Sequence, residues 1–186
     1  NQVFQKLAKH TSNPKTELKY KNSYTFLISV VLSAQATGKS VNSATKNLFK
    51  FVKTPEDILK LGETKLKTYI KTIGLYNLKA KNIINLSKIL VKDYQSKVPS
   101  DFNLLVSLPG VGNKTASVYQ NEILNIPRIA VDTHVYRVSN RTGLVKTKSA
   151  DETQKKLESI VPQKWLKDAH HLLILHGRYT CKAQKP

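Results

Sequence analysis

Two residues of this sequence, Lys114 and Asp132, could together carry out nucleophilic chemistry on a sugar. An unprotonated lysine amine attacks an electrophilic sugar carbon, and a nearby carboxylate takes up protons or stabilises developing positive charge. Taken singly, each residue has a plainer interpretation. Lys114 could be one more surface lysine, and Asp132 could be the N-cap of a helix. Asp132 could also serve in both ways.

The residues around Lys114 form a glycine-rich turn that could hold a phosphate. Two glycines around one apolar residue let the backbone turn sharply, and the N–H groups of such a turn, beside a helix N-terminus, can hold an anion. An ordinary connection between two helices is the alternative. The residues that would form this phosphate-binding turn are Leu108, Gly110, Val111, Gly112, Asn113 and Thr115.

The elements that carry these residues are expected to be helices. Apolar residues recur at three- and four-residue spacing along almost the whole chain, and no segment alternates as a strand would. The sequence therefore predicts an all-α protein. Thr54 and Pro55 predict a helix start, and Gly62 and Gly74 predict helix stops. Further helices are expected at about 78–94, from 113 onward, and at 132–141, 149–160 and 164–176.

The charge of the chain is strongly positive. Its 186 residues include 31 Lys and Arg against 12 Asp and Glu, which gives a net charge of +19. A sustained positive surface attracts polyanions, which favours a nucleic-acid partner over the alternative of a merely solvated lysine-rich face. The longest interval without an acid after Glu63 runs to Asp93 and holds Lys65, Lys67, Lys71, Lys79, Lys81, Lys88 and Lys92.

Other classes of protein are not favoured. No apolar stretch reaches the roughly 18 residues of a membrane span, and the first residues do not resemble a secretory signal, so we expect an intracellular protein. The single cysteine, Cys181, excludes an internal disulfide. The histidines show no metal-ligand spacing, because the adjacent His170 and His171 point to different helix faces.

Five segments of the chain together form the pattern of one family. The most specific are 108–116 (LPGVGNKTA) and 131–135 (VDTHV), and the others are 32–37 (LSAQAT), 69–77 (YIKTIGLYN) and 173–181 (LILHGRYTC). These segments closely resemble the helix-hairpin-helix DNA glycosylase superfamily. The resemblance covers nearly the whole chain, and it implies two helical lobes that flank a DNA groove. A six-helix barrel domain is expected at 15–126, with the helix-hairpin-helix near 101–125, and a second lobe at 1–14 plus 127–186.

The resemblance also implies roles for individual residues. Lys114 matches the nucleophile of the bifunctional members, and Asp132 matches its partner. Gln35 matches the residue that the family inserts into the space left by a flipped nucleotide, and its alternative is a helix-terminal glutamine bonded to the backbone. Ser33 and His134 could line the lesion pocket or could be structural.

The implied function is base excision DNA repair. We expect a bifunctional DNA glycosylase and abasic-site lyase that removes oxidised pyrimidines through a lysine Schiff base and β-elimination. The expected partner is double-stranded DNA with damaged pyrimidines or abasic sites, and the expected protein is a monomer, cytoplasmic and nucleoid-associated, in a bacterium. Two alternatives stay open: a catalytically inactive DNA-binding remnant, and a monofunctional glycosylase.

The sequence departs from the family at its C-terminal end. Cys181 matches the first of four cysteines that hold a [4Fe-4S] cluster in relatives, and the sequence stops before the second. We therefore expect no cluster in this chain, either because it is truncated or because it represents a cluster-free lineage. The hairpin carbonyls could bind a monovalent cation. Gly38 stands where relatives usually have Asp, and Asn113 stands where they often have a basic residue.

Overall fold

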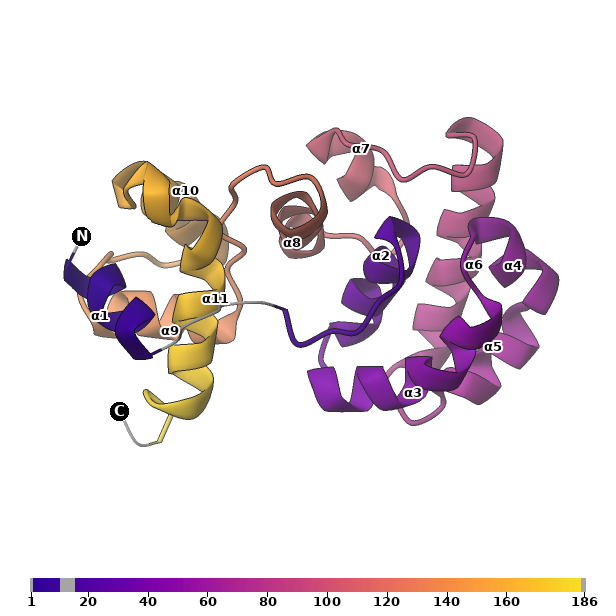
Figure 1. The fold of residues 1–186 in the computed structure, drawn as a ribbon, viewed down its shortest axis with the longest axis horizontal. Coiled ribbons are helices and arrows are strands. Elements are labelled where there is room, and N and C mark those ends of the chain that lie inside the picture. The colour runs from indigo at the N-terminus through magenta and orange to yellow at the C-terminus, as the bar shows by residue number, and fades with distance from the viewer. Residues whose placement is uncertain (1, 11–15, 185–186) are drawn as a thin grey trace. The chain divides into compact units, whose positions relative to one another are not determined.

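The computed structural model describes residues 2–10 and 16–184, and all regular structure in these residues is helical (Figure 1). The expectation of an all-α protein is confirmed. The helices are α1 (Gln2–His10), α2 (Ser23–Ser33), α3 (Gly38–Phe51), α4 (Pro55–Leu61), α5 (Glu63–Ile70), α6 (Tyr76–Asp93), α7 (Phe102–Ser107), α8 (Asn113–Ile123), α9 (Thr133–Arg141), α10 (Ala150–Ile160) and α11 (Gln163–Tyr179).

The chain divides into two compact units. One unit is Glu17–Tyr119, which contains α2 to α7 and most of α8. The other combines Asn1–Thr16 with Gln120–Pro186, and it contains α1 and α9 to α11. The boundary expected from the sequence at residues 14 and 15 lies outside the described residues.

Side-chain hydrogen bonds explain where helices begin. At the start of α4, the Thr54 hydroxyl accepts from the N–H of Asp57, and the Asp57 carboxylate accepts from the N–H of Thr54. Pro55 occupies the first turn, where its missing N–H costs nothing. Gly62 ends the helix with a φ of 78°. The start and the stop predicted for this helix are therefore confirmed.

Two features of the helices were not expected. Gly74 is not a helix stop, because α5 ends at Ile70 with Lys71 as its C-cap and α6 begins at Tyr76. Helix α3 was not predicted either. Thr37 provides its N-cap by accepting a hydrogen bond from the N–H of Ser40, a signal that is present in the sequence.

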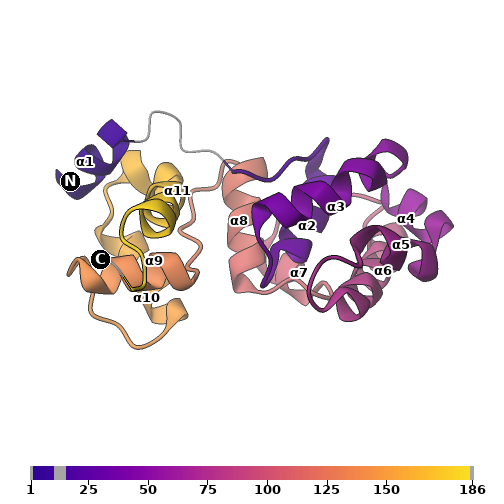
Figure 2. The same cartoon turned by 90° about the horizontal axis from the view of Figure 1, so that it is seen from below.

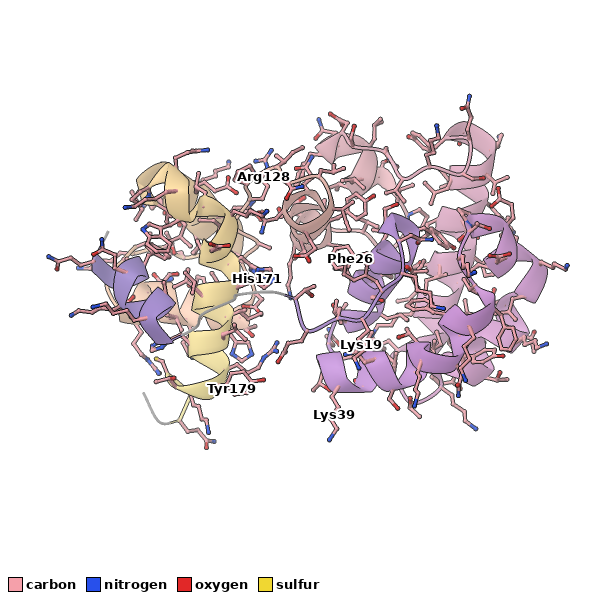
Figure 3. The ribbon with its side chains drawn as sticks, in the orientation of Figure 1. Lys19, Phe26, Lys39, Arg128, His171 and Tyr179 are labelled. Carbon is pink, nitrogen blue, oxygen red and sulfur yellow. The ribbon has the colours of Figure 1, made fainter. Side chains whose placement is uncertain are left out.

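Helix α2 forms the centre of the Glu17–Tyr119 unit. Its residues 24–32 are all buried, which is typical of a helix covered on every side. Helices α3 and α6 pack against α2, and α4 and α5 pack against α6. Phe26, labelled in Figure 3, packs against two tyrosine rings. Its ring centroid lies 4.7 Å from that of Tyr20 and 6.3 Å from that of Tyr119. This packing buries α2 in the core of the unit, and Gln35 follows the C-terminal end of the helix.

In the other unit, α9 and α1 both pack against α11, and Figures 1 and 2 show α1 beside α11. The core of this unit consists of Phe4, Ile129, Val131, Val135, Val138, Val145, Leu157, Val161, Ala169, Leu172, Leu173 and Cys181. Gly177 of α11 lies where α9 comes closest. A Cβ at Gly177 would lie 2.9 Å from Val138 Cγ2 and 3.0 Å from His134 Cβ.

Gly177→Ala is therefore expected to destabilise this unit by about 1–3 kcal/mol, because packed helices must separate to admit a methyl group. Chemical denaturation of the variant measures this loss. The double variant Gly177→Ala with Val138→Ala removes the closest contact, so its loss should be smaller than the sum of the two single losses. Strict additivity would show that the contact with Val138 is not the cause.

Candidate functional site

The hairpin between α7 and α8 has an apolar inner side and a glycine backbone on its outer side. Leu108 and Val111 are buried, with 2% and 5% of their surface exposed, and the N–H of Val111 donates to the carbonyl of Leu108 at 3.0 Å. Gly110 and Gly112 are exposed, and Gly110 has a φ of 81°. Ligands at this turn would therefore meet backbone groups, while the side chains of Leu108, Val111 and Thr115 support it from inside.

Gly110→Ala is expected to destabilise the Glu17–Tyr119 unit by about 1–3 kcal/mol, since a left-handed backbone disfavours a Cβ. The added Cβ would also lie 3.0 Å from Asn82 Cβ of α6. Gly74→Ala is the matched control, because its Cβ would meet no atom within 4 Å. Urea unfolding compares the two variants, and equal losses would contradict the role of backbone strain at Gly110.

Lys114 is the second residue of α8 and is exposed. The first hydrogen bond within this helix joins the N–H of Ala116 to the carbonyl of Gly112 at 3.0 Å. The N–H groups before it therefore lie at the open end of the helix, where the helix dipole favours an anion. The arrangement presents a lysine amine beside a turn suited to a phosphate.

Asp132 is the N-cap of α9, as one of the two interpretations of this residue predicted. Its Oδ1 accepts from the N–H of Val135 at 2.8 Å, and its carbonyl accepts from the N–H of Tyr136 at 2.8 Å. The side chain is half-buried. One carboxylate oxygen thus accepts a hydrogen bond from the helix, and this cap is compatible with the second interpretation.

The segment that leads to Asp132 is held by hydrogen bonds with two residues. The sequence did not indicate either of them as part of the site. Glu158 of α10 accepts from the N–H of Ile129 at 3.0 Å, and Nδ1 of the buried His170 on α11 donates to the carbonyl of Ala130 at 2.7 Å. These contacts span 29 and 40 residues, so no local pattern could have indicated them. The neighbouring His171 is also buried, and burial lowers its pKa.

Ser33 and His134 each have a structural contact. The Ser33 hydroxyl donates to the carbonyl of Val30 at 2.7 Å, within its own helix. His134 packs where α9 meets α11, and its Nδ1 lies 3.4 Å from Nη2 of Arg137. The same Arg137 group donates to the carbonyl of Gly177 at 2.7 Å. Ser33 and His134 are both half-buried, and their place in a lesion pocket stays a prediction.

Gln35 lies exposed in the turn between α2 and α3. Its φ is 55°, in the left-handed region that few residues other than glycine adopt. Residues held in such a conformation are concentrated at functional sites, where the surrounding structure maintains them. The geometry is therefore that of a side chain presented by a constrained turn.

Most of the lysines between Glu63 and Asp93 are exposed. The exposed ones are Lys65, Lys71, Lys81, Lys88 and Lys92. Lys67 is half-buried and pairs with Glu63 at 2.7 Å. Lys79 is buried, which corrects the expectation that all seven contribute to the surface. Lys39, in the acid-free interval before Glu56, extends away from α3 (Figure 3).

Cys181 is buried, and two arginines of α9 contact it. Arg137 donates to the Cys181 carbonyl at 3.0 Å, and Arg141 Nη1 lies 3.5 Å from its Sγ. One thiol does not fit a [4Fe-4S] cluster, which takes four, and the described residues contain no group of three or more His, Cys, Asp or Glu that could hold a metal. Within the same residues, no helix could span a lipid bilayer.

An all-α chain with a glycine hairpin, an exposed lysine after it and a later N-cap aspartate has the arrangement expected of the helix-hairpin-helix DNA glycosylases. Residues 28–163, which are more than half of the chain, match the HhH-GPD superfamily of base excision DNA repair proteins. The chain belongs to this superfamily.

Within the superfamily, the chain is similar to endonuclease III. It is 58% identical to the Rickettsia conorii endonuclease III over 186 residues, 100% of this chain and 89% of that protein. It is 48% identical to the Escherichia coli K12 endonuclease III over 185 residues, 100% of this chain and 88% of that protein. A trapped endonuclease III–DNA covalent intermediate superposes with a TM-score of 0.94 at 43% identity, over 98% of this chain and 86% of that one.

Proposed function

We propose that this chain is a bifunctional DNA glycosylase and abasic-site lyase of base excision repair, acting on double-stranded DNA with oxidised pyrimidines or abasic sites. The observation that carries the proposal is the exposed Lys114 in the first turn of α8, directly after the glycine hairpin. Its support from relatives is that similar proteins are endonucleases III and that one of them was trapped in a covalent intermediate with DNA. A covalent intermediate needs a nucleophile, and Lys114 supplies an amine.

The reaction begins when the damaged nucleotide is turned out of the stack. The Lys114 amine attacks C1′ of the deoxyribose, and the bond from C1′ to the base breaks as the base leaves with the electron pair and takes up a proton. The sugar ring opens to a Schiff base between Nζ and C1′. This iminium acidifies the 2′ proton, whose removal expels the 3′ phosphate by β-elimination. Water then hydrolyses the Schiff base and returns the free lysine.

The other residues of the site bind the DNA or assist the reaction at Lys114. Asp132 stabilises positive charge during base departure and accepts protons, with its cap to Val135 fixing the carboxylate. The backbone of Gly110 and Gly112, with Asn113, contacts a phosphate, and Gln35 fills the space left by the flipped nucleotide. The lesion-pocket roles of Ser33 and His134, and a monovalent cation at the hairpin carbonyls, stay predictions.

We also propose a domain organisation and a cellular location for this protein. We assign the six-helix barrel domain predicted at 15–126 to the Glu17–Tyr119 unit with the rest of α8, and the second lobe to α1 and α9 to α11. The protein acts as a monomer on nucleoid DNA in the bacterial cytoplasm. No step passes through an iron–sulfur cluster, since these residues supply one thiol.

Product analysis tests the proposal on a duplex that contains one oxidised thymine. A broken strand with a 3′ unsaturated aldehyde is expected of the bifunctional enzyme. An intact strand with an abasic site would indicate a monofunctional glycosylase, and unchanged DNA bound by folded protein would indicate an inactive remnant. Either of the last two results contradicts the proposal.

A further inference from the structure

Lys79 is a buried cation in the first turn of α6. Only 5% of its surface is exposed, and it shares the buried face of α6 with Ile83, Leu86 and Leu90. An ammonium group in such surroundings is costly unless hydrogen bonds replace its lost water. The partners of its Nζ therefore indicate what the residue does.

Those partners are carbonyl groups at the C-terminal end of α2. Lys79 Nζ donates to Leu32 O at 2.9 Å and to Ala34 O at 2.6 Å. The last carbonyls of a helix lack donors within the helix, and they form the negative end of its dipole. Burial lowers the pKa of Lys79, and its hydrogen bonds to these carbonyls favour the charged form.

The remaining carbonyls of this helix end already have donors. Ser33 Oγ donates to Val30 O, Ala34 N to Val31 O and Ala36 N to Ser33 O. Lys79 thus supplies the donors that the helix end lacks. It does so from a position 45 residues away in the sequence.

The carbonyl of Ala34 belongs to the same planar peptide group as the N–H of Gln35. A hydrogen bond that fixes this carbonyl therefore fixes the orientation of the peptide from which the Gln35 side chain is presented. Gln35 has a φ of 55°, a conformation that persists only where the surrounding structure holds it. Lys79 provides such a hold directly before Gln35.

We propose that Lys79 is a positioning residue, whose ammonium group holds the peptide between Ala34 and Gln35 and so keeps the Gln35 side chain presented to DNA. The inference rests on the proposed function, in which Gln35 fills the space left by the flipped nucleotide. Lys79 acts through Gln35 and does not itself contact the reacting atoms.

A double-mutant cycle tests this coupling on the 186-residue chain. The measured quantity is the ratio of affinities for a duplex with a stable abasic-site analogue and for the same duplex undamaged. Lys79→Met should lower this ratio about tenfold, the loss of hydrogen bonds from one charged group. Gln35→Ala should lower it by at least as much, because it removes the side chain that Lys79 positions. The double variant should be no worse than Gln35→Ala alone, because Lys79 acts through Gln35. Affinity for undamaged DNA should be unchanged by Lys79→Met.

Two further variants separate positioning from charge and from folding. Lys155→Met removes the same charge from an exposed site on α10, and the ratio should stay at the wild-type value. If Lys79→Met melts below the assay temperature, Lys79→Gln takes its place in the cycle, because its side chain is polar but is uncharged and one bond shorter than that of lysine. Hydrogen exchange at the amides of residues 34–36 should be faster in either Lys79 variant.

Three outcomes would overturn the inference. An unchanged affinity ratio in the Lys79 variants would show that Lys79 has no effect on recognition of the abasic analogue. Losses that multiply in the double variant would show that Lys79 acts independently of Gln35. A wild-type chain without preference for the abasic analogue would overturn the proposed function together with this inference. The first two outcomes, with the wild-type preference intact, would overturn this inference alone.

Discussion

Lys114→Gln is expected to lose strand cleavage at an abasic site by at least about 1000-fold, because an amide nitrogen cannot attack C1′ or form a Schiff base. DNA affinity should fall by less than about threefold, since one positive charge among many is removed. Single-turnover cleavage and a binding titration on the same duplex measure the two effects.

Lys114→Arg is the matched control for charge. It keeps a positive charge at the start of α8, but its guanidinium group is always protonated and is not a nucleophile. The variant should therefore bind like the wild type and cleave like Lys114→Gln. Cleavage by Lys114→Arg near the wild-type rate would mean that Lys114 contributes charge only.

Asp132→Asn is expected to slow turnover by about 100-fold or more, the usual contribution of a positioned acid or base. Asparagine is as good an N-cap as aspartate, so the hydrogen bond to the N–H of Val135 and the stability of α9 should be kept. Initial rates and thermal unfolding of the same preparation separate catalysis from capping.

Two further variants separate the catalytic role of Asp132 from its role as a helix cap. Asp57→Asn removes a carboxylate from the capping box of α4 and should leave turnover unchanged. Asp132→Ala removes both cap and charge, so it should lose turnover and also about 1 kcal/mol of stability. An unchanged rate in Asp132→Asn would leave Asp132 as a helix cap only.

Much of the fold could be predicted because its signals are local. The Thr54 and Pro55 start of α4, the Gly62 stop and the Asp132 cap each depend on residues within one helical turn. The apolar spacing that predicts helices reflects burial on one side of each helix. Gly74 shows the limit of this reasoning, because a glycine in a connection need not be the residue that ends a helix.

The burial of Lys79 was missed although the sequence contains a signal for it. Lys79 precedes Ile83, Leu86 and Leu90 at helical spacing, so it lies on the apolar face of α6. A count of charges treats every lysine as a surface residue and overlooks this position. The partners of Lys79, like those of Glu158 and His170, lie far away in the sequence, and only the packed structure identifies them.

Borohydride trapping of this chain on a duplex with an abasic site, followed by peptide mapping of the adduct, identifies the attacking residue. Borohydride reduces a Schiff base to a stable secondary amine, which marks the attacking residue. We expect one covalent protein–DNA adduct, attached at Lys114. An adduct at another lysine, or no adduct from folded protein that binds the duplex, would contradict this expectation.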